Sequence, residues 1–591
     1  MLLPGIVGHA IAAASGHWAA TLLVLACLLP PITYVITSIS ASHQSRSEEE
    51  GREPPINPYW FPFLGNLFGF LSAPDLLIHS IMQVTCHIHH SRRFGHEGPV
   101  AIRIGPEKVY LLTRPDEYGA VLRATRSLTN KAVMAMVMEQ VFGSPPSARH
   151  VYRNDKSGIG AVPLAGSSVP EKLRVWHHQH KTSARYLQGE SLRQMTTRVI
   201  DHLSAELAKT TPGEPIDSGD WVELDDFYTW FVHKLFAAST VAIFGAHILK
   251  LNEGFVKDFW EYMESWPTYS KMLPKFLAPR AYRARQRVLD GIKKWHQFSR
   301  QHSDYRNNSS EYPDWDEYWG SSWIKARQQW GMDTGCMDDD ALASEDLAVM
   351  TAASANALPL AFWTLLEVFR DRDLLEQVRD EISGTIIDNR GSHLKTKEPQ
   401  LPLRFSIEDL TSGPLLQSVY AEVLRLRMSA LLSRSPMQGD YKLGPYKLKQ
   451  DANVFISTNV AHENEAIWAE RTDNGRRPLT RFWAERFLVP DEKVTNKDVY
   501  VTQGKNPRKK FSTDGLDGAW IPYGGGALMC PGRHLAKKEM MGSVAVFAAY
   551  FDLEVLGALP KMNHAFHGLG AQPPAEPTPV RIRRKLGVVK R

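Results

Sequence analysis

Apolar positions along much of the chain recur with the period of an α-helix. Residues 192–289 follow this pattern for most of their length, and long helical patterns return at 342–370 and 412–428. A further stretch of helix-forming residues with an apolar stripe begins near His534. These segments predict a protein built mainly from helices.

Shorter segments alternate between apolar and polar positions, as half-buried strands do. Residues 98–114 predict a β-hairpin, and short strands are expected at 441–448 and 452–458. Residues 301–320 are rich in polar and turn-forming residues and are expected to form a surface loop. The predicted fold class is therefore mainly α with small β-sheets.

The first 45 residues contain no Lys, Arg, Asp or Glu. Within them, residues 17–40 are long and apolar enough to cross a bilayer, which takes about 20 apolar residues. A cleaved secretory signal is the alternative, but such signals usually have a charged start and a shorter apolar core. We therefore expect residues 1–45 to be an uncleaved membrane anchor. Arg46 and Arg52 follow it, so the positive-inside rule favours a cytosolic position for the rest of the chain.

A linker and proline-rich hinge are predicted at 46–66. The segment "PPINPYWFPFLGN" (54–66) holds four prolines, which stiffen the chain into extended segments. Residues 67–591 contain no internal repeat and are expected to form one mostly helical domain.

The composition is that of a globular protein, with 43% hydrophobic and 23% charged residues. The net charge of +5 is too small to indicate a nucleic-acid partner, and no such partner is expected. The four cysteines, at 27, 86, 336 and 530, lie far apart, which argues against a disulfide scaffold and favours a reducing compartment.

Cys530 lies in "GGGALMCPGRHLA" (524–536), between a triple glycine and a predicted helix. Pro531 suits the first turn of that helix, so we expect the thiol at the helix N-terminus, where free amides and the dipole favour a thiolate. The glycines at 524–526 allow the backbone to lie close against a flat ligand. A thiolate offered to a planar ligand suggests axial ligation of haem iron.

Two other roles for Cys530 stay open on the residues of this loop alone. An isolated cysteine in a glycine turn is most often a buried free thiol. A zinc site with His534 is compatible with the spacing of four residues, although no second ligand pair is evident in the sequence.

The segment "YGGGALMCPG" resembles the haem-binding signature of the cytochromes P-450, F-x-x-G-x-x-x-C-x-G. Tyr523 takes the aromatic position, and Gly526, Cys530 and Gly532 are in register. The resemblance implies the cytochrome P-450 fold with an N-terminal transmembrane helix, and it identifies residues 67–591 as a haem-thiolate catalytic domain. It also implies haem b as the cofactor and Cys530 as the ligand of its iron.

Other segments, in the order typical of the family, add to this resemblance. "AEVLRLR" places Glu422 and Arg425 in the family's E-x-x-R spacing, and "FWAERFL" resembles F-x-P-E-R-F with Arg486 as its arginine. Together they imply a Glu–Arg–Arg cluster that braces the haem loop. "VAHENEAIW" (460–468) and the hinge at 54–66 also resemble family segments, so the resemblance covers nearly the whole chain.

Several residues depart from the family pattern. The arginine that often stands two residues before the cysteine is Leu528, and W-x-x-x-R reads as Trp176 followed by His180. The proline of F-x-P-E-R-F is replaced by Ala484. The resemblance implies Trp176 as a residue of the haem site, and His180 and Arg434, which follows the E-x-x-R motif, as contacts of the haem propionates.

A further departure lies in "TAASANALPLAFW" (351–363). Most members carry an acid and a threonine over the haem, where this chain has Asn356 and Ala357. Pro359 lacks an N–H and frees the carbonyl of Ala355. We expect Asn356 to position substrate or an ordered water over the iron; the alternative is that it satisfies the broken helix backbone. This pattern resembles the branch of sterol 7-alpha-hydroxylases and prostacyclin synthase, which includes both monooxygenases and isomerases.

The resemblance implies a haem-thiolate monooxygenase that oxidises a sterol, terpenoid or other lipophilic secondary metabolite with O₂ and electrons from NADPH through NADPH-cytochrome P-450 reductase. The expected location is the endoplasmic reticulum membrane, with a single-pass anchor and a cytosolic catalytic domain. The missing acid–threonine pair supports a second hypothesis, a reductase-independent isomerase or dehydratase acting on a peroxide. A third is a non-catalytic haem- or sterol-binding membrane protein. By analogy with the family, the pocket is expected from residues 150–175, 240–280, 428–434 and 565–570.

Basic residues flank the cysteine loop. "KNPRKK" (505–510) precedes it, and Lys537 and Lys538 follow it. Such a run is usually only a solvated charge cluster, but its place beside the loop predicts a docking surface for an acidic face of the reductase.

Overall fold

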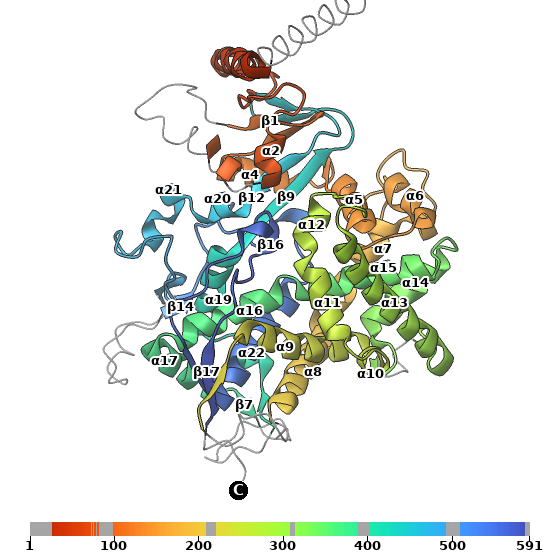
Figure 1. The fold of residues 1–591 in the computed structure, drawn as a ribbon, viewed down its shortest axis with the longest axis vertical. Helices are drawn as coiled ribbons and strands as arrows, with labels where there is room; N and C mark the ends of the chain where they lie inside the picture. The colour runs from red at the N-terminus through yellow and green to blue at the C-terminus, as the bar shows by residue number, and fades with distance from the viewer. Residues whose placement is uncertain are drawn as a thin grey trace, which may run out of the picture. The chain divides into compact units, whose positions relative to one another are not determined.

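The computed structural model describes residues 26–81 except 73, 75 and 79, and residues 98–208, 220–307, 314–387, 402–491 and 509–585. The chain divides into two compact units. The first holds Met1–Thr129 and Leu432–Val460, and the second holds Asn130–Leu431 and Ala461–Arg591. Figure 1 follows both along the chain by colour.

The first unit contains a helix over residues 26–46 and short strands. Its other elements are α2 (Leu67–Ser72), β1 (Val100–Ile104), β2 (Glu107–Leu111), α4 (Pro115–Arg123), β3 (Leu128–Thr129), β10 (Tyr441–Leu443), β11 (Tyr446–Leu448) and β12 (Val454–Ser457). β1 and β2 pair antiparallel with Val100 opposite Leu111, which confirms the predicted hairpin. Gly105 turns the chain between them with a left-handed φ of 59°. β10 and β11 form a second hairpin and β12 pairs parallel with β2, so the strands expected in this region are also confirmed.

The second unit is mostly helical. Its longer helices are α5 (Lys131–Gln140), α6 (Pro146–Asn154), α7 (Val175–Tyr186), α8 (Gly189–Ala208), α9 (Phe227–Phe244), α11 (Phe255–Glu264), α13 (Pro279–His302), α14 (Ser322–Asp333), α15 (Asp339–Ser354), α16 (Ala357–Phe369), α17 (Arg372–Ser383), α19 (Pro414–Arg427) and α22 (Arg533–Tyr550). Its shorter helices include α10 (His247–Leu251), α12 (Trp266–Ser270), α18 (Ile407–Leu410) and α21 (Glu465–Trp468). α20 (Thr458–His462) runs across the division between the units.

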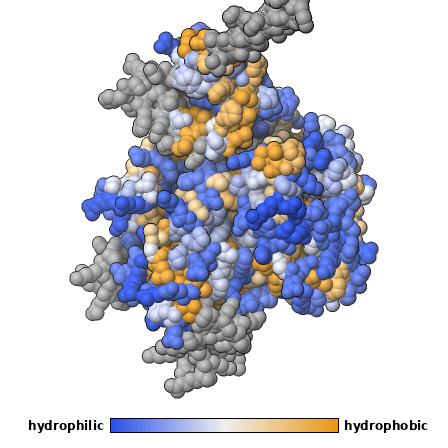
Figure 2. All heavy atoms as spheres, viewed as in Figure 1, coloured by the Kyte–Doolittle hydropathy of each residue, from blue (hydrophilic) through white to orange (hydrophobic). Residues whose placement is uncertain are grey.

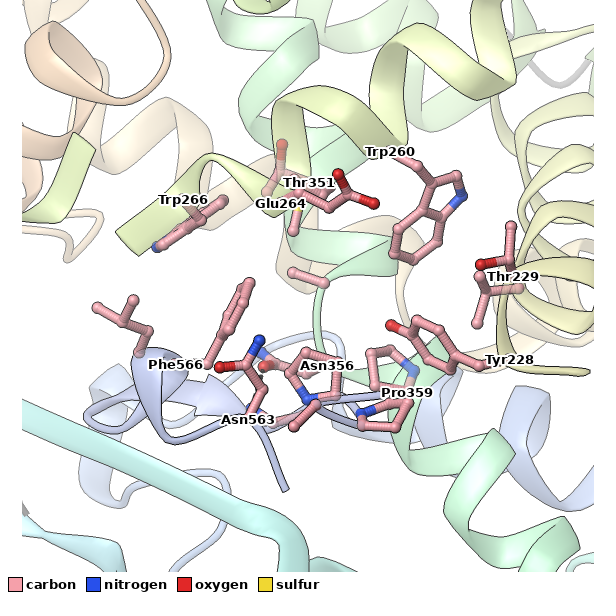
Figure 3. Close-up of a pocket in the computed structure, with 18 of the residues that line it drawn as sticks. Tyr228, Thr229, Trp260, Glu264, Trp266, Thr351, Asn356, Pro359, Asn563 and Phe566 are labelled. Carbon is pink, nitrogen blue, oxygen red and sulfur yellow. Dashed lines mark hydrogen bonds between the residues drawn. The ribbon is translucent and has the colours of Figure 1, made fainter. Parts of the chain in front are cut away.

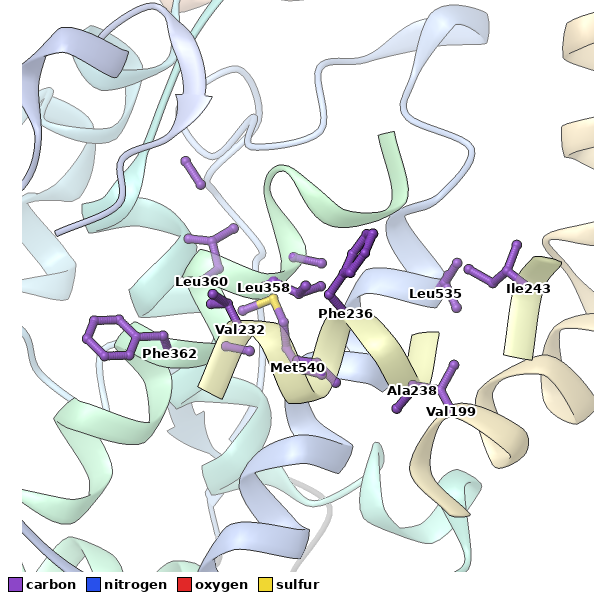
Figure 4. Packing of buried hydrophobic residues seen from close by; sticks show 14 of the residues in the cluster. Val199, Val232, Phe236, Ala238, Ile243, Leu358, Leu360, Phe362, Leu535 and Met540 are labelled. Atoms are coloured by element: carbon purple, nitrogen blue, oxygen red, sulfur yellow. The ribbon is translucent and has the colours of Figure 1, made fainter. Parts of the chain in front are cut away.

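An apolar core forms where α8, α9, α16 and α22 pack against one another. Val199 of α8, Phe236 of α9, Leu358 of α16 and Met540 of α22 are all fully buried in it, as Figure 4 shows. Burial of this apolar surface is the main favourable contribution to the folding of the unit. Over this unit, Figure 2 shows a mostly hydrophilic outer face with small apolar patches.

Short strands complete the second unit. They are β4 (Val222–Leu224), β5 (Trp315–Asp316), β6 (Gly320–Ser321), β7 (Ile386–Ile387), β8 (Arg404–Phe405), β13 (Leu488–Pro490), β14 (Lys509–Phe511), β15 (Phe551–Val555), β16 (Leu569–Ala571) and β17 (Val580–Arg584), while β9 (Met428–Pro436) crosses the division. β17 lies between β15 and β4 in an antiparallel sheet. β16 pairs with the start of β9, with Leu569 opposite Ala430. These pairings agree with the predicted class, mainly α with small sheets.

Two stretches of the described residues are long and apolar enough to cross a membrane. They are Phe227–Phe244 and Asp339–Phe369. The most apolar 18 residues of these stretches are 61% and 78% buried inside the protein, so both belong to the core. Residues 1–25 of the predicted anchor lie outside the described residues.

The predicted surface loop at 301–320 is wrong at residues 314–320, and residues 308–313 lie outside the described residues. Trp319 is fully buried, and its indole N–H donates to the carbonyl of Ser303 at 2.9 Å. Its ring packs 5.4 Å from that of Trp295 in α13, and β5 and β6 pair on either side of the turn. The prediction failed because it weighed the polar composition of the segment and not Trp319, whose buried ring fixes the segment to the core.

The helical pattern at 342–370 is interrupted at Ala355 and Asn356, between α15 and α16. Pro359 explains the break, because it offers no N–H to the carbonyl of Ala355 and its ring crowds the preceding turn. Helical bonding resumes when the N–H of Leu360 donates to the carbonyl of Asn356 at 3.1 Å.

Candidate active site

The loop that carries Cys530 is closed by its own backbone. The N–H of Cys530 donates to the carbonyl of Tyr523 at 3.0 Å, and the hydroxyl of Tyr523 lies 2.6 Å from that of Tyr420. Gly524 and Gly526 have left-handed φ values of 71° and 67°, which residues with a Cβ rarely adopt. Cys530 itself is exposed. The loop thus presents an accessible sulfur on a glycine backbone.

The helix that follows does not by itself make this thiol a thiolate. Desolvation by the surrounding protein raises the pKa of Cys530 more than the N–H groups of Gly532 and Arg533 lower it. α22 begins at Arg533 with Gly532 as its N-cap residue, so Pro531 and the thiol precede the first turn, which corrects the predicted helix start. A coordinated metal ion deprotonates a thiol outright, so an iron bound at Cys530 would stabilise the thiolate that the helix alone does not.

Glu422, Arg425 and Arg486 meet in a fully buried cluster. Arg425 donates to both oxygens of Glu422, at 2.8 and 2.9 Å, and Arg486 donates to the same carboxylate at 2.9 Å. The remaining guanidinium N–H groups reach backbone carbonyls, including those of Leu479 at 2.6 Å and Arg471 at 2.7 Å. Buried charges are tolerated when they are paired and hydrogen-bonded in this way. The cluster ties α19 to the segment that precedes the cysteine loop.

His462 joins this cluster to the cysteine loop, a role that sequence reasoning missed. Its buried ring places Nδ1 3.1 Å from the carbonyl oxygen of Arg425, while Nε2 accepts the N–H of Ile521 at 3.2 Å. Burial and then the charge of Arg425 lower the pKa of His462 to about 3, so the ring is neutral with its proton on Nδ1. His462 lies within the quoted segment 460–468, but nothing in its spacing pointed to partners 37 and 59 residues away.

These residues fit a haem bound through Cys530. The sulfur is a soft, accessible ligand, and the glycines beside it remove side chains from the backbone that would lie against a flat ring. A zinc site with His534 lacks support: among the described residues, no group of three or more His, Cys, Asp or Glu side chains could hold a metal ion.

Trp176 and His180 lie on α7. Trp176 is buried, its indole N–H donates to the carbonyl of Tyr152 at 3.2 Å, and the ammonium of Lys131 lies 4.5 Å above its ring. The indole N–H of Trp176 therefore already has an acceptor within the protein. Burial and then the charge of Lys131 lower the pKa of the half-buried His180.

Arg434 lies in the first unit, so its place beside the haem stays a prediction. Its side chain is buried and donates to the carbonyl of Ser433 at 2.8 Å. Burial lowers the pKa of Arg434 to about 10, which leaves the guanidinium charged at neutral pH.

A cavity of about 500 Å³ lies within the second unit. It is walled by α5, α9, α11, α12, the break between α15 and α16, and residues 563–577. Aromatic rings, among them Trp260, Trp266 and Phe566, and apolar side chains cover most of its surface (Figure 3). Volumes of about 300–1,000 Å³ with such linings are typical of small-molecule sites.

Some of the segments expected to line the pocket contribute to this cavity. Segments 240–280 and 565–570 contribute lining residues. Among the described lining residues of this cavity, none comes from segments 150–175 and 428–434. Sequence reasoning missed the wall formed by the first turns of α9, because its apolar pattern indicated only a core helix.

Asn356 lines the cavity at the helix break. Its Oδ1 accepts the N–H of Ala571 in β16 at 2.8 Å, so the side chain is held by a strand distant in the sequence. Gly570, beside that contact, has a φ of 139°, and a Cβ added there would collide with the same oxygen. Ala357, the first residue of α16, is buried.

The basic residues around the cysteine loop are mostly engaged. Lys509 pairs with Glu485 at 2.8 Å, the ammonium of Lys537 donates to the side chain of Gln417 at 2.6 Å, and Lys538 lies 3.7 Å from a carboxylate oxygen of Glu408. Lys510 is exposed. The rest of the run, 505–508, lies outside the described residues.

Comparison with known proteins agrees with this site. A profile of the family described as cytochrome P450 matches residues 55–576. "Cytochrome P450 monooxygenase efuG" of Hormonema carpetanum is 32% identical over 93% of this chain and 92% of the relative. "Cytochrome P450 monooxygenase fsoE" of Humicola fuscoatra is 30% identical, over 90% and 88%. "Cholesterol 7-alpha-monooxygenase" of Cricetulus griseus is 24% identical, over 90% and 93%. The chain therefore belongs to the cytochrome P450 family of oxidoreductases, in which a cysteine thiolate holds the haem iron.

Proposed function

We propose that this chain is a monooxygenase that oxidises a lipophilic small molecule, with a sterol, terpenoid or related secondary metabolite as the substrate class. O₂ is the oxidant, and electrons come from NADPH through NADPH-cytochrome P-450 reductase. The observation that carries the proposal is the accessible thiol of Cys530 on a loop braced by the buried Glu422–Arg425–Arg486 cluster. The printed names of the relatives, including a cholesterol monooxygenase, support the substrate class.

Haem, when bound through a thiolate, supplies oxygen activation, because the thiolate favours cleavage of the O–O bond. The chain's own part is to hold the ligand sulfur, to orient the substrate and to keep water away. The largely apolar cavity suits the last two tasks. Asn356 is proposed to act at its wall: Oδ1 is taken by Ala571, which directs the amide NH₂ to a ligand or water.

An isomerase or dehydratase acting on a peroxide is the second candidate. Asn356 and Ala357, found where most members carry the acid and the threonine, favour it. Dependence on NADPH separates the two candidates, since an isomerase turns over without NADPH or reductase.

The proposed location is the endoplasmic reticulum membrane, with residues 1–45 as anchor and the catalytic part in the cytosol. The described part of the anchor supports this, because the helix over 26–46 exposes Leu28, Ile36 and Ile39. Removal of residues 1–45 should release the protein from microsomal membranes with its haem content unchanged. Loss of haem from the truncated protein would show that residues 1–45 contribute to the haem-binding fold and are not a separate anchor.

Lys510 is proposed as part of the reductase-docking surface. Lys510→Glu should slow reduction by the reductase, most at low salt, because charge complementarity acts mainly on association. Lys257→Glu, a reversal of another exposed lysine on α11, is the matched control. Equal reduction rates for the two variants would reject Lys510 as a contact.

The test of the function itself is the spectrum of the reduced, carbon-monoxide-bound protein together with turnover. The wild-type chain should give the thiolate-type Soret band and NADPH-dependent product. Cys530→Ser should lose both, because a hydroxyl is a poor soft ligand. Cys336→Ser replaces a half-buried free thiol and should keep both. A thiolate-type band in Cys530→Ser would contradict the assignment of the ligand.

A further inference from the structure

The charged residues that line the cavity are all acidic. Asp226, Glu264 and Glu576 belong to its wall, and among its described lining residues there is no Lys or Arg. An anionic ligand would therefore meet acidic side chains in a largely apolar space. Burial raises the pKa of Glu264 and the charge of Arg280 opposes that shift, but Arg280 is not among the lining residues and pairs with Glu261 at 3.0 Å.

Asp226 is already used by the protein. One of its oxygens accepts the N–H of Thr578 at 3.2 Å, and the other accepts the hydroxyl of Thr229. Its carboxylate thus fastens the start of α9 to the C-terminal wall of the cavity, and it has little capacity left for a ligand.

Glu264 and Tyr228 are in a different position. Glu264 ends α11 and Tyr228 lies in the first turn of α9, and Figure 3 shows the carboxylate and the phenol both pointing toward the cavity. Within the part of the chain that the structure describes, neither group has a hydrogen-bond or ion-pair partner. Burial, then Asp226, then Glu264 raise the pKa of Tyr228, so the phenol keeps its proton and feels the Glu264 charge.

The ring of Tyr228 is held firmly. It packs edge-on against Phe362 at 5.0 Å and against Trp260 at 6.3 Å, and Trp260 in turn stacks on His233 at 6.2 Å. The phenol O–H is therefore presented from a rigid aromatic wall, while Glu264 is exposed to the cavity side of α11. A fixed donor and an acceptor carboxylate on neighbouring helices match a group that both donates and accepts, which is what a hydroxyl does.

We infer that Tyr228 and Glu264 form the specificity-determining end of this cavity and select an uncharged lipid that bears a free hydroxyl group. The hydroxyl donates to the Glu264 carboxylate and accepts from the Tyr228 phenol. This inference rests on the proposed function, in that the cavity is taken as the substrate site. Ethers lose the donated hydrogen bond, and acids or sulfate esters meet the carboxylate as like charges.

The inference is tested by equilibrium displacement of radiolabelled cholesterol from the full-length, detergent-solubilised protein, without NADPH or reductase. Unlabelled cholesterol, its 3-methyl ether and cholesterol sulfate are the competitors. For the wild type, the ether and the sulfate should each need about tenfold or more higher concentration than cholesterol, the usual effect of losing a hydrogen bond to a charged group. Glu264→Gln should reduce the discrimination against sulfate, Tyr228→Phe should weaken cholesterol binding, and Glu264→Lys should favour the sulfate.

Glu253→Gln is the matched control, because Glu253 is an exposed carboxylate outside the lining of the cavity. It should keep the wild-type order of competitors, and thermal unfolding of each variant checks that it is folded. Equal displacement by sulfate and cholesterol in the wild type, an unchanged order in all Glu264 and Tyr228 variants, or no saturable cholesterol binding would overturn the inference. Selective binding of the alcohol without any NADPH-dependent product would instead refute the proposed monooxygenase and leave the inference standing.

Discussion

Replacement of His462 by phenylalanine tests the link between the buried cluster and the cysteine loop. The ring volume is nearly kept, but the carbonyl of Arg425 and the N–H of Ile521 lose their partner in a buried place. Each unsatisfied group costs about 1–3 kcal/mol, so His462→Phe should lower the free energy of unfolding by about 2–6 kcal/mol near neutral pH. That is a large share of the stability of a typical domain, about 5–15 kcal/mol.

The same histidine gives the wild type a specific acid sensitivity. Its pKa is lowered from the ordinary 6.5 to about 3 in the folded protein, so the unfolded chain binds a proton first as the pH falls. Its contribution is therefore fully present above pH 6.5 and is lost as the pH falls toward 3. At pH 5 the loss is about 2 kcal/mol, from about 1.4 kcal/mol per pH unit.

Denaturant unfolding of both proteins at pH 7.5 and pH 5.0, followed by circular dichroism, measures these effects. Transfer of haem to apomyoglobin measures how firmly the loop holds its ligand, and the variant should release haem faster. The gap in stability between wild type and variant should narrow by about 2 kcal/mol at the lower pH. His302→Phe, at an exposed histidine of α13, should change neither quantity. Equal stability of His462→Phe and wild type at pH 7.5, or an equal gap at both pH values, would refute this reasoning.

Other substitutions probe individual side chains and one glycine of the fold. Glu422→Gln leaves two buried guanidinium groups without their anion and should lower the free energy of unfolding by about 3–5 kcal/mol. The measurements are the yield of haem-loaded protein on expression and the midpoint of unfolding, both of which should fall. Gly570→Ala should destabilise the protein for two reasons, the positive φ of this residue and the collision of the added Cβ with Asn356. Adding Asn356→Ala should relieve only the collision. Unfolding of the two single variants and the double variant separates the two contributions. Burial raises the pKa of Glu539 to about 8, so its carboxyl stays protonated in the folded protein up to that pH. The free energy of unfolding therefore falls as the pH rises from about 4.5, where the unfolded chain ionises, to about 8. Glu539→Gln should flatten that part of the curve of stability against pH, and a wild-type slope in this variant would show that another group titrates there.

What could be predicted from the sequence is what neighbours along the chain determine. The glycines before Cys530, the proline that breaks the helix at 355–356 and the alternation at 98–114 act through backbone geometry within a few residues. Each of these features could therefore be predicted from a few neighbouring residues, although α22 begins two residues later than the sequence predicts.

The remainder depends on contacts between distant segments, which no local pattern encodes. Asn356 binds the backbone of Ala571, 215 residues further along the chain. Trp319 is buried because α13 offers it a neighbouring ring, not because of the polar residues around it. Tyr228 and Glu264 likewise line one cavity only because α9 and α11 converge on it.

The wall of the cavity formed by residues 563–577 has a consequence for the order in which the protein is made. Glu422, His462, Arg486 and Cys530 all precede that segment in the sequence and are synthesised before it. A growing chain therefore possesses every residue of the braced cysteine loop while its cavity is still open on one side. The proposed substrate cavity is therefore completed only after every residue of the cysteine loop has been made.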